Sequence, residues 1–374
     1  MDAVTFTAPG GKAGVELVEG QDGNALQFTF PKDGPSVFAI GRARGQASWD
    51  QAAGFSFLAK GDGSPQVVGL QFIWGDDYGL RYDFAFPLTG SAWQKIVVPW
   101  RDLIPALPAP GAKLIDAKNG NAPSKLGPLW FGRWWYWREY PALKFAVDDL
   151  RLEPSIPVDT RDLTPTGAPL SRTLAKLQRG EPVTIVTMGD SLTDTAHWAN
   201  RKTNWPALLE AKLRAAYKSE LKLVNPAIGG TQLRQNLVLI PRWLLTTPEP
   251  DLVTILFGYN DWDAGMRGDM FFEAQKDAVE RVRRATGGKA DVLIMTTAPA
   301  LERWETMSEL ADACRRAARD SKAGLADLEA AFHAAGGEDR ARFYVDDKVH
   351  AGPAGHELIA ETVFRALEKA GSGN

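Results

Sequence analysis

The chain has 374 residues, with 43 lysines and arginines, 46 aspartates and glutamates, and a formal net charge of −3. This balance gives no basic footprint, so sequence-independent nucleic-acid binding is not expected, and a hydrophobic content of 44% excludes general disorder. No uncharged apolar run approaches the roughly 18–20 residues that span a bilayer. The single cysteine, Cys314, excludes an intrachain disulfide framework and a multi-cysteine metal site.

The first part of the chain alternates apolar and polar residues in short segments that are broken by Gly, Pro and Asp. Alternation with a period of two is typical of half-buried strands, and the clearest examples are residues 26–30, 55–57, 82–86 and 143–147. At Asp148-Asp149 the apolar phase slips by one residue, which predicts a β-bulge or a strand edge. Many short strands without long helical patterns predict an all-β sandwich over residues 1–155.

Residues 156–170 are proline-rich, have little periodicity and are predicted to be a linker. From residue 171 to 374 the pattern changes to an alternation of strands and helices. Buried strands are predicted at 182–188, 221–228, 251–257 and 291–296, and helices at 205–217, 271–284, 306–318 and 357–370. This alternation predicts a doubly wound α/β domain with a parallel sheet, in which sites gather at the carboxyl ends of the strands.

Four short blocks follow these strands or precede the last helix, and they carry the groups that acyl transfer needs. Ser191 follows the first strand, and a serine nucleophile needs a base. His350 can supply that base, and Asp347, three residues earlier, can orient it. Fixed donors for the carbonyl oxygen are the backbone N–H groups of Ser191 and Gly230 and the side-chain amide of Asn260.

Together the four blocks resemble the SGNH hydrolase superfamily, the GDSL-type serine esterases, over roughly residues 180–370. The resemblance implies a three-layer, flavodoxin-like α/β fold, with catalytic Ser191, Asp347 and His350 and an oxyanion hole from Ser191, Gly230 and Asn260. It implies no cofactor and no metal. The doublet Gly229-Gly230 leaves a one-residue ambiguity, which we resolve in favour of Gly230 by aligning Asn225 and Ile228 with the family pattern.

Two segments of the first half, Ser91–Trp100 and Ala146–Leu152, are similar to those of jelly-roll carbohydrate-binding modules. A module of this kind beside an SGNH domain resembles the architecture of carbohydrate acetylesterases. The resemblance implies hydrolysis of O-acetyl or other short acyl esters on a polysaccharide or oligosaccharide, with the acetylated carbohydrate as the partner. Two alternatives remain open: a polysaccharide O-acetyltransferase that uses the same residues, and a non-catalytic carbohydrate-binding protein.

The aromatic stretch at residues 129–140 is the main candidate for binding substrate. If it continues as a strand, Trp135 and Trp137 share one face, and Trp134 and Tyr136 share the other. One pair is then expected to pack in the core, while the other is exposed or lies against the catalytic domain. An exposed pair, with Arg133, would bind glycan or form a wall of the active-site cleft.

The remaining titratable residues have simpler interpretations. His197 is interpreted as a loop residue, with lining of the pocket as the alternative. His356-Glu357 is expected to form a helix cap or a first-turn pair, because position 360 is alanine and a zinc-binding H-E-x-x-H motif is therefore absent. Asp190 and Asp261 are expected to brace the site loops. We expect a secreted or periplasmic location with the signal peptide absent from this sequence, with the cytoplasm as the alternative, and the sequence indicates no oligomeric state.

Overall fold

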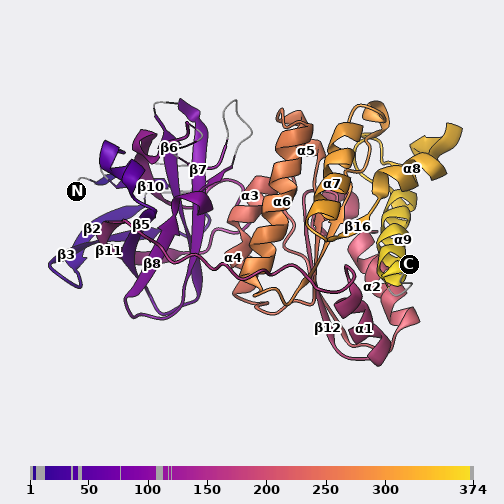
Figure 1. Ribbon diagram of the computed structural model, residues 1–374, viewed down its shortest axis with the longest axis horizontal. Helices are drawn as coiled ribbons and strands as arrows, with labels where there is room; N and C mark the ends of the chain where they lie inside the picture. Colours follow the sequence, from indigo (N-terminus) through magenta and orange to yellow (C-terminus); the bar gives the residue numbers. More distant parts are fainter. Residues whose placement is uncertain are drawn as a thin grey trace. The chain divides into compact units, whose positions relative to one another are not determined.

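The computed structural model describes residues 3–5, 13–34, 37–40, 44–75, 77–106, 113–116, 118 and 120–370. The chain divides into two units, Met1–Thr160 and Arg161–Asn374, here called the N-terminal and C-terminal units. Strands dominate the first unit, whereas helices and strands alternate in the second (Figure 1).

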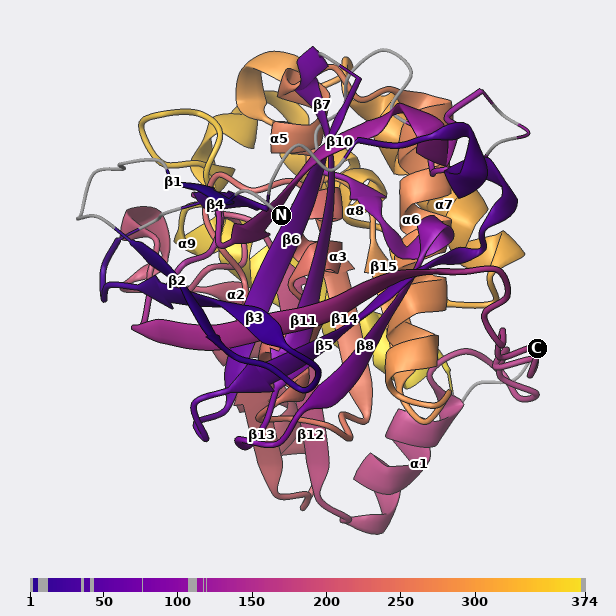
Figure 2. The same ribbon diagram turned by 90° about the vertical axis from the view of Figure 1, so that its left-hand side faces the viewer.

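The N-terminal unit contains two sheets in which all neighbouring strands are antiparallel. The first has the order β1 (Ala3–Thr5), β4 (Val37–Ile40), β10 (Leu126–Gly132), β6 (Gln66–Trp74), β7 (Asp77–Leu88) and β9 (Ile104–Pro105). The second has the order β2 (Gly14–Glu19), β3 (Asn24–Phe30), β11 (Leu143–Glu153), β5 (Gly54–Gly61) and β8 (Gln94–Pro99). Figure 2 looks onto this second sheet, with β3, β11, β5 and β8 side by side.

The two sheets share one aromatic core, because every second side chain of a strand points to the same face. Phe28 of β3 and Phe145 of β11 stack with ring centroids 5.1 Å apart, and the ring of Phe131 from the other sheet lies 5.6 Å from Phe28. The predicted slip in β11 is confirmed: its register against β5 shifts between Asp148 and Arg151, and Asp149 has a φ of 51°. The first unit is therefore a mostly antiparallel β domain, and its jelly-roll assignment stays a prediction.

The aromatic stretch does not continue as a strand, so the prediction of two alternating aromatic faces is wrong. Strand β10 ends at Gly132, whose φ of 156° favours glycine, and the N–H of Trp137 then closes a turn on the carbonyl of Trp134. Trp134 is buried and packs so tightly over Gly69 that a Cβ there would lie 1.8 Å from its ring. Among the four aromatics of the two expected pairs, only Trp135 is exposed, at 60%.

Arg133 lies inside the N-terminal unit and is not available to a glycan. Its guanidinium is buried and donates to the backbone carbonyls of Pro31, Gly34 and Pro141. A buried cation needs such acceptors because it has lost its water. Trp137 is buried as well, so the expectation of an exposed pair with Arg133 beside it is wrong.

The C-terminal unit is built on a five-stranded sheet in which all neighbouring strands are parallel. Its order is β13 (Leu221–Val224), β12 (Val183–Gly189), β14 (Leu252–Leu256), β15 (Asp291–Met295) and β16 (Gly324–Ala326). The predicted parallel sheet is therefore confirmed. Because the chain moves outward from β12 in both directions, a switch point lies between β12 and β14, where parallel α/β sheets bind ligands.

Helices cover both faces of this sheet. They are α1 (Ser171–Arg179), α2 (Trp205–Ala216), α3 (Leu233–Val238), α4 (Ile240–Leu244), α5 (Tyr259–Asp263), α6 (Gly268–Ala285), α7 (Ser308–Asp320), α8 (Leu328–Gly336) and α9 (Pro353–Lys369). Helices α6 and α7 pack side by side (Figure 1), and α2 packs against α9. Successive residues of β12, such as Ile185 and Val186, are both buried, as a sheet covered on two faces requires.

Candidate active site

Ser191 lies on a tight turn immediately after β12. The N–H groups of Thr193 and Asp194 both donate to the carbonyl of Asp190, at 3.0 and 2.9 Å, and these bonds close the turn. Gly189 permits the turn because a Cβ at this position would lie 2.2 Å from Oγ1 of Thr193. The turn leaves Ser191 half-buried at the end of a rigid central strand, where its Oγ can meet a substrate.

His350 reaches this serine from the segment before α9. Its Nε2 lies 2.8 Å from Oγ of Ser191, although 159 positions of sequence separate the two residues. Val345 donates its N–H to the carbonyl of His350, and the N–H of Lys348 donates to the carbonyl of Val345. These bonds fold the loop tightly, and Leu301 anchors it by donating to the carbonyl of Lys348.

Asp347 holds the other side of the His350 ring. Its Oδ2 lies 2.5 Å from Nδ1 of His350, while its Oδ1 accepts the N–H groups of Val349 and His350, each at 2.9 Å. Partial burial raises the pKa of Asp347, but the hydrogen bonds from His350 and Val349 outweigh it and lower the pKa below its usual value. The carboxylate is therefore ionised at neutral pH and fixes the orientation of the ring.

Gly230 lies in the loop after β13, which Asp194 braces by accepting the N–H of Gly229 at 3.1 Å. Gly230 has a φ of 79°, which favours glycine, and a Cβ at this position would have no atom within 4 Å. Within the described residues, the N–H groups of Ser191 and Gly230 donate to no protein acceptor. The N–H of Gly229 is already occupied by Asp194, whereas the N–H of Gly230 remains available to a ligand.

Asn260 brings a side-chain amide from the start of α5. Its Nδ2 donates to the carbonyl of Thr231 at 3.0 Å and lies 3.4 Å from Oδ2 of Asp190. The short bond to Thr231 fixes the amide, and the second N–H is held only weakly. A substrate oxygen in the path of that second N–H could accept from it at the cost of this weak bond alone.

Asp190 and Asp261 are the buried carboxyl groups beneath these loops. Asp190 accepts the N–H of Leu192 at 2.9 Å, and Asp261 accepts the N–H of Leu233 at 3.0 Å. Burial raises the pKa of Asp190 to about 6 and that of Asp261 to about 7. Both side chains bond to the backbone of the site loops, as the bracing interpretation requires.

His197 lies in a loop, as interpreted from the sequence, and this loop brings its ring against that of His350. Its ring stacks on that of His350, with centroids 4.4 Å apart, and a Cβ at Gly229 would lie 3.3 Å from its Cδ2. Partial burial and the neighbouring His350 lower the pKa of His197. Trp198, which sequence reasoning missed, is 55% exposed with its ring 5.8 Å from that of His350. Pattern reasoning gives no signal for Trp198, because an exposed tryptophan after a histidine has no characteristic spacing.

Asn200 and His356 form a support that sequence reasoning also missed. Asn200 donates to the carbonyls of Ser191 and Asp194, at 2.6 and 2.8 Å, and its Oδ1 lies 3.1 Å from Nε2 of His356. His356 lies in the first turn of α9, as expected, but it is fully buried, and burial lowers its pKa to about 4. The pair ties the serine turn to α9.

The described residues contain neither a metal-ion site nor a membrane-spanning helix. Among those residues, no group of three or more His, Cys, Asp or Glu side chains is arranged to hold a metal ion. The described helices also include none that is both long enough and apolar enough to cross a membrane.

Comparison with known proteins points to one family for much of the C-terminal unit. The family described as "GDSL-like Lipase/Acylhydrolase" matches residues 187–358. Solved structures similar to the chain include a variant of the acetyl xylan esterase Axe2 from Geobacillus stearothermophilus, at 22% identity over 50% of this chain and 95% of that one, with a TM-score of 0.43. Another is the lipase/acylhydrolase from Enterococcus faecalis, at 22% identity over 50% of this chain and 96% of that one, with a TM-score of 0.43. No curated protein matches. The C-terminal unit thus contains a GDSL-like lipase/acylhydrolase domain.

Proposed function

We propose that the protein is a serine esterase that removes acetyl or other short acyl groups from a polysaccharide or oligosaccharide. The observation that carries this proposal is the continuous chain of contacts from Asp347 through His350 to Ser191, with distances of 2.5 and 2.8 Å. A serine within reach of an oriented histidine base is the arrangement that activates a hydroxyl at neutral pH.

In the first half of the reaction, Oγ of Ser191 attacks the ester carbonyl carbon while its proton passes to Nε2 of His350. Asp347 stabilises the resulting imidazolium. The N–H groups of Ser191 and Gly230 and the amide of Asn260 donate to the carbonyl oxygen as it becomes negative. When the intermediate collapses, the C–O bond to the alcohol breaks, and the departing oxygen takes the proton from His350.

In the second half, water attacks the acyl group that is bound to Ser191. His350 removes a proton from the water and returns it to Oγ of Ser191 as the acyl–serine bond breaks. The products are the carboxylic acid and the free enzyme, and the atoms balance without a cofactor. The same acyl-enzyme would serve an acetyltransferase, in which a sugar hydroxyl replaces the water.

The carbohydrate part of the proposal is supported by the aromatic surface beside the site. Trp198 presents an exposed ring next to His350, and flat aromatic area of this kind suits the apolar faces of sugar rings. A sugar that stacks there would lie close to the residues that attack its acetyl group.

The experiment measures acetate release from 4-nitrophenyl acetate and from an acetylated xylan, for the full chain and for Ser191→Ala. We expect Ser191→Ala to lower kcat by about 10⁶, as in other triads, while Ser155→Ala, at an exposed serine outside the site, leaves it unchanged. Turnover by Ser191→Ala above a few per cent of the parent would contradict the nucleophile assignment. Transfer of the acetyl group to a sugar hydroxyl, without release of acetate, would identify a transferase.

A further inference from the structure

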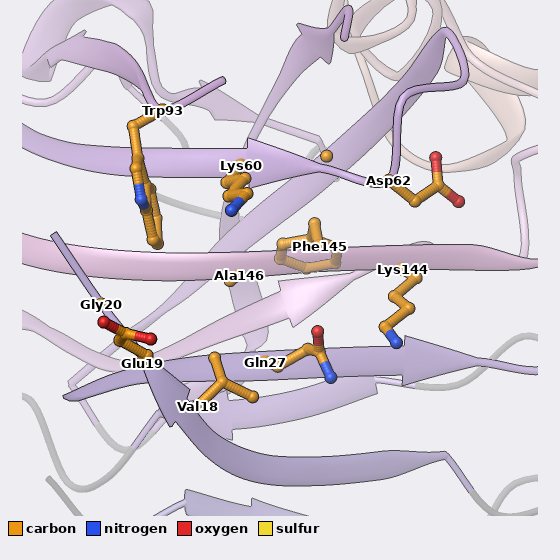
Figure 3. A pocket seen from close by; sticks show the side chains of 11 residues that line it. Val18, Glu19, Gly20, Gln27, Lys60, Asp62, Trp93, Lys144, Phe145 and Ala146 are labelled. Carbon is orange, nitrogen blue, oxygen red and sulfur yellow. The ribbon is translucent and has the colours of Figure 1, made fainter. Parts of the chain in front are cut away.

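The N-terminal unit has a hollow of its own, on the outer face of its five-stranded sheet. The hollow has a volume of about 470 Å³, which lies within the usual size range of ligand sites, ~300–1,000 Å³. All of its lining residues belong to this unit and come from β2, β3, β5, β11 and the segments next to them, and Figure 3 shows their side chains around the hollow. They are Val18, Glu19, Gly20, Gln27, Lys60, Gly61, Asp62, Trp93, Lys144, Phe145 and Ala146.

The hollow arises from one small side chain in the middle of a row across the sheet. Ala146 of β11 pairs with Gln27 of β3 on one side and with Lys60 of β5 on the other. Phe145 points to the opposite face, into the core. Because Ala146 ends at Cβ while its two neighbours are long, the surface is lowest at Ala146 and rises on both sides.

An aromatic ring forms one wall of the hollow. Trp93 lies just before β8 and is half-buried, and Nζ of Lys60 lies 5.8 Å from the centre of its ring. Figure 3 shows Trp93, Lys60 and Asp62 on one side of Ala146 and Gln27 on the other. A half-buried tryptophan beside a hollow offers a rigid apolar surface to a ligand at small entropic cost.

The other lining groups are polar, and their charges balance. Two ammonium groups, Lys60 and Lys144, are offset by two carboxylates, Glu19 and Asp62. Within the described part of the chain, neither lysine has a carboxylate within ion-pair distance. Lys144 interacts with Asp62 only electrostatically, and Nζ of Lys60 lies over the ring of Trp93, so both ammonium groups keep N–H groups for a ligand. Oδ1 of Asp62 instead accepts hydrogen bonds within its own turn. The site therefore has many hydrogen-bonding groups but no net charge to attract an ionic ligand.

From these observations we infer that the hollow is a binding site for a neutral glycan chain. An aromatic wall with several donors and acceptors matches a sugar ring, which has apolar C–H faces and a rim of hydroxyl groups. The exposed rim at Glu19, Lys60 and Lys144 leaves room for a chain to continue past the bound sugar. The inference also bears on the proposed function, because it names an uncharged polysaccharide backbone as the substrate class.

The test uses the full chain carrying Ser191→Ala, so that acetyl groups are not removed during the measurement. Retardation in native gels would be measured with soluble arabinoxylan, mixed-linkage β-glucan and galactomannan, and with polygalacturonate as a polyanion. We expect at least one neutral polysaccharide to retard the protein and polygalacturonate to have no effect. Adding Trp93→Ala should weaken binding about tenfold or more.

Two further variants make the test specific. Ala146→Phe fills the hollow without removing any polar group, so it should abolish binding, and the thermal midpoint of the variant checks that the unit remains folded. Trp135→Ala removes a more exposed tryptophan of the same unit and should leave binding intact. The inference is overturned if no neutral polysaccharide binds, if only polygalacturonate binds, or if Ala146→Phe binds as the parent does. These results do not depend on ester cleavage, so failure of the esterase proposal would be recognised separately.

Discussion

Replacement of Asp347 by asparagine tests the mechanism most directly, because the structure determines how the new amide must lie. Oδ1 of Asp347 accepts two backbone N–H groups at 2.9 Å. An asparagine must keep its carbonyl oxygen at that position, since its NH₂ group cannot accept a hydrogen bond. The NH₂ group then faces Nδ1 of His350 in place of the present oxygen at 2.5 Å.

This arrangement forces His350 into the wrong tautomer. Nδ1 must accept from the new amide, so the proton of the neutral ring moves to Nε2, which lies 2.8 Å from Oγ of Ser191. That nitrogen can then no longer remove the serine proton, and the imidazolium loses its neighbouring negative charge. We expect kcat to fall by about 10³–10⁴, or roughly 4–5.5 kcal/mol of transition-state stabilisation, with little change in KM.

The assay is steady-state hydrolysis of 4-nitrophenyl acetate, with the thermal midpoint as a check on folding. Asp346→Asn is the matched control, because this adjacent carboxylate is exposed. Asp346→Asn should retain full activity. The reasoning is refuted if Asp347→Asn keeps activity within tenfold of the parent, or if Asp346→Asn shows the larger loss.

Three other predictions concern groups around the triad. Asn260→Ala should lower kcat by about 10²–10³ with a smaller change in KM; an effect on KM alone would make Asn260 a substrate-binding residue. The folded-state pKa of Asp261, about 7, lies above its unfolded value of about 3.9, so the parent loses stability as pH rises from 4 through 7. The thermal midpoint of Asp261→Asn should therefore rise relative to the parent over this range, and a constant difference would contradict the buried neutral carboxyl. The pKa of His356 is lowered to about 4, so the parent loses stability as pH falls from about 6.5 through 4. His356→Ala should not show this acid loss of stability. At pH 8 the substitution should lower the free energy of unfolding by about 1–3 kcal/mol, because Oδ1 of Asn200 is left without its partner. Calorimetry over the two pH ranges checks both variants.

Local pattern was sufficient to place the main elements of the C-terminal unit. The strands near residues 183 and 252 and the helices near 205, 271, 308 and 353 lie within a few residues of their expected positions. Burial on both faces makes such strands continuously apolar, and this signal is contained within each segment. The five proposed site residues could be chosen together because parallel strands bring their carboxyl ends to one edge.

The aromatic stretch of the N-terminal unit shows where local pattern is insufficient. Nothing near Gly132 in the sequence indicates that the strand stops there, and Trp134 is buried because Gly69, from another strand, leaves room for its ring. Arginine is usually a surface residue, and the burial of Arg133 depends on acceptors that include the carbonyls of Pro31 and Gly34, about a hundred residues earlier in the sequence.

The sequence by itself indicated a β-rich first unit and a parallel α/β second unit with its main strands and helices, and it suggested the residues that could carry acyl transfer, because these inferences depend on periodicity and on short motifs. The tertiary structure decided which side chains meet. It placed His197 and Trp198 beside His350, joined Asn200 to His356, and put Trp93 rather than Trp134 beside a hollow. The relative positions of these side chains are fixed only when the surrounding elements have packed together, so local sequence cannot reveal them.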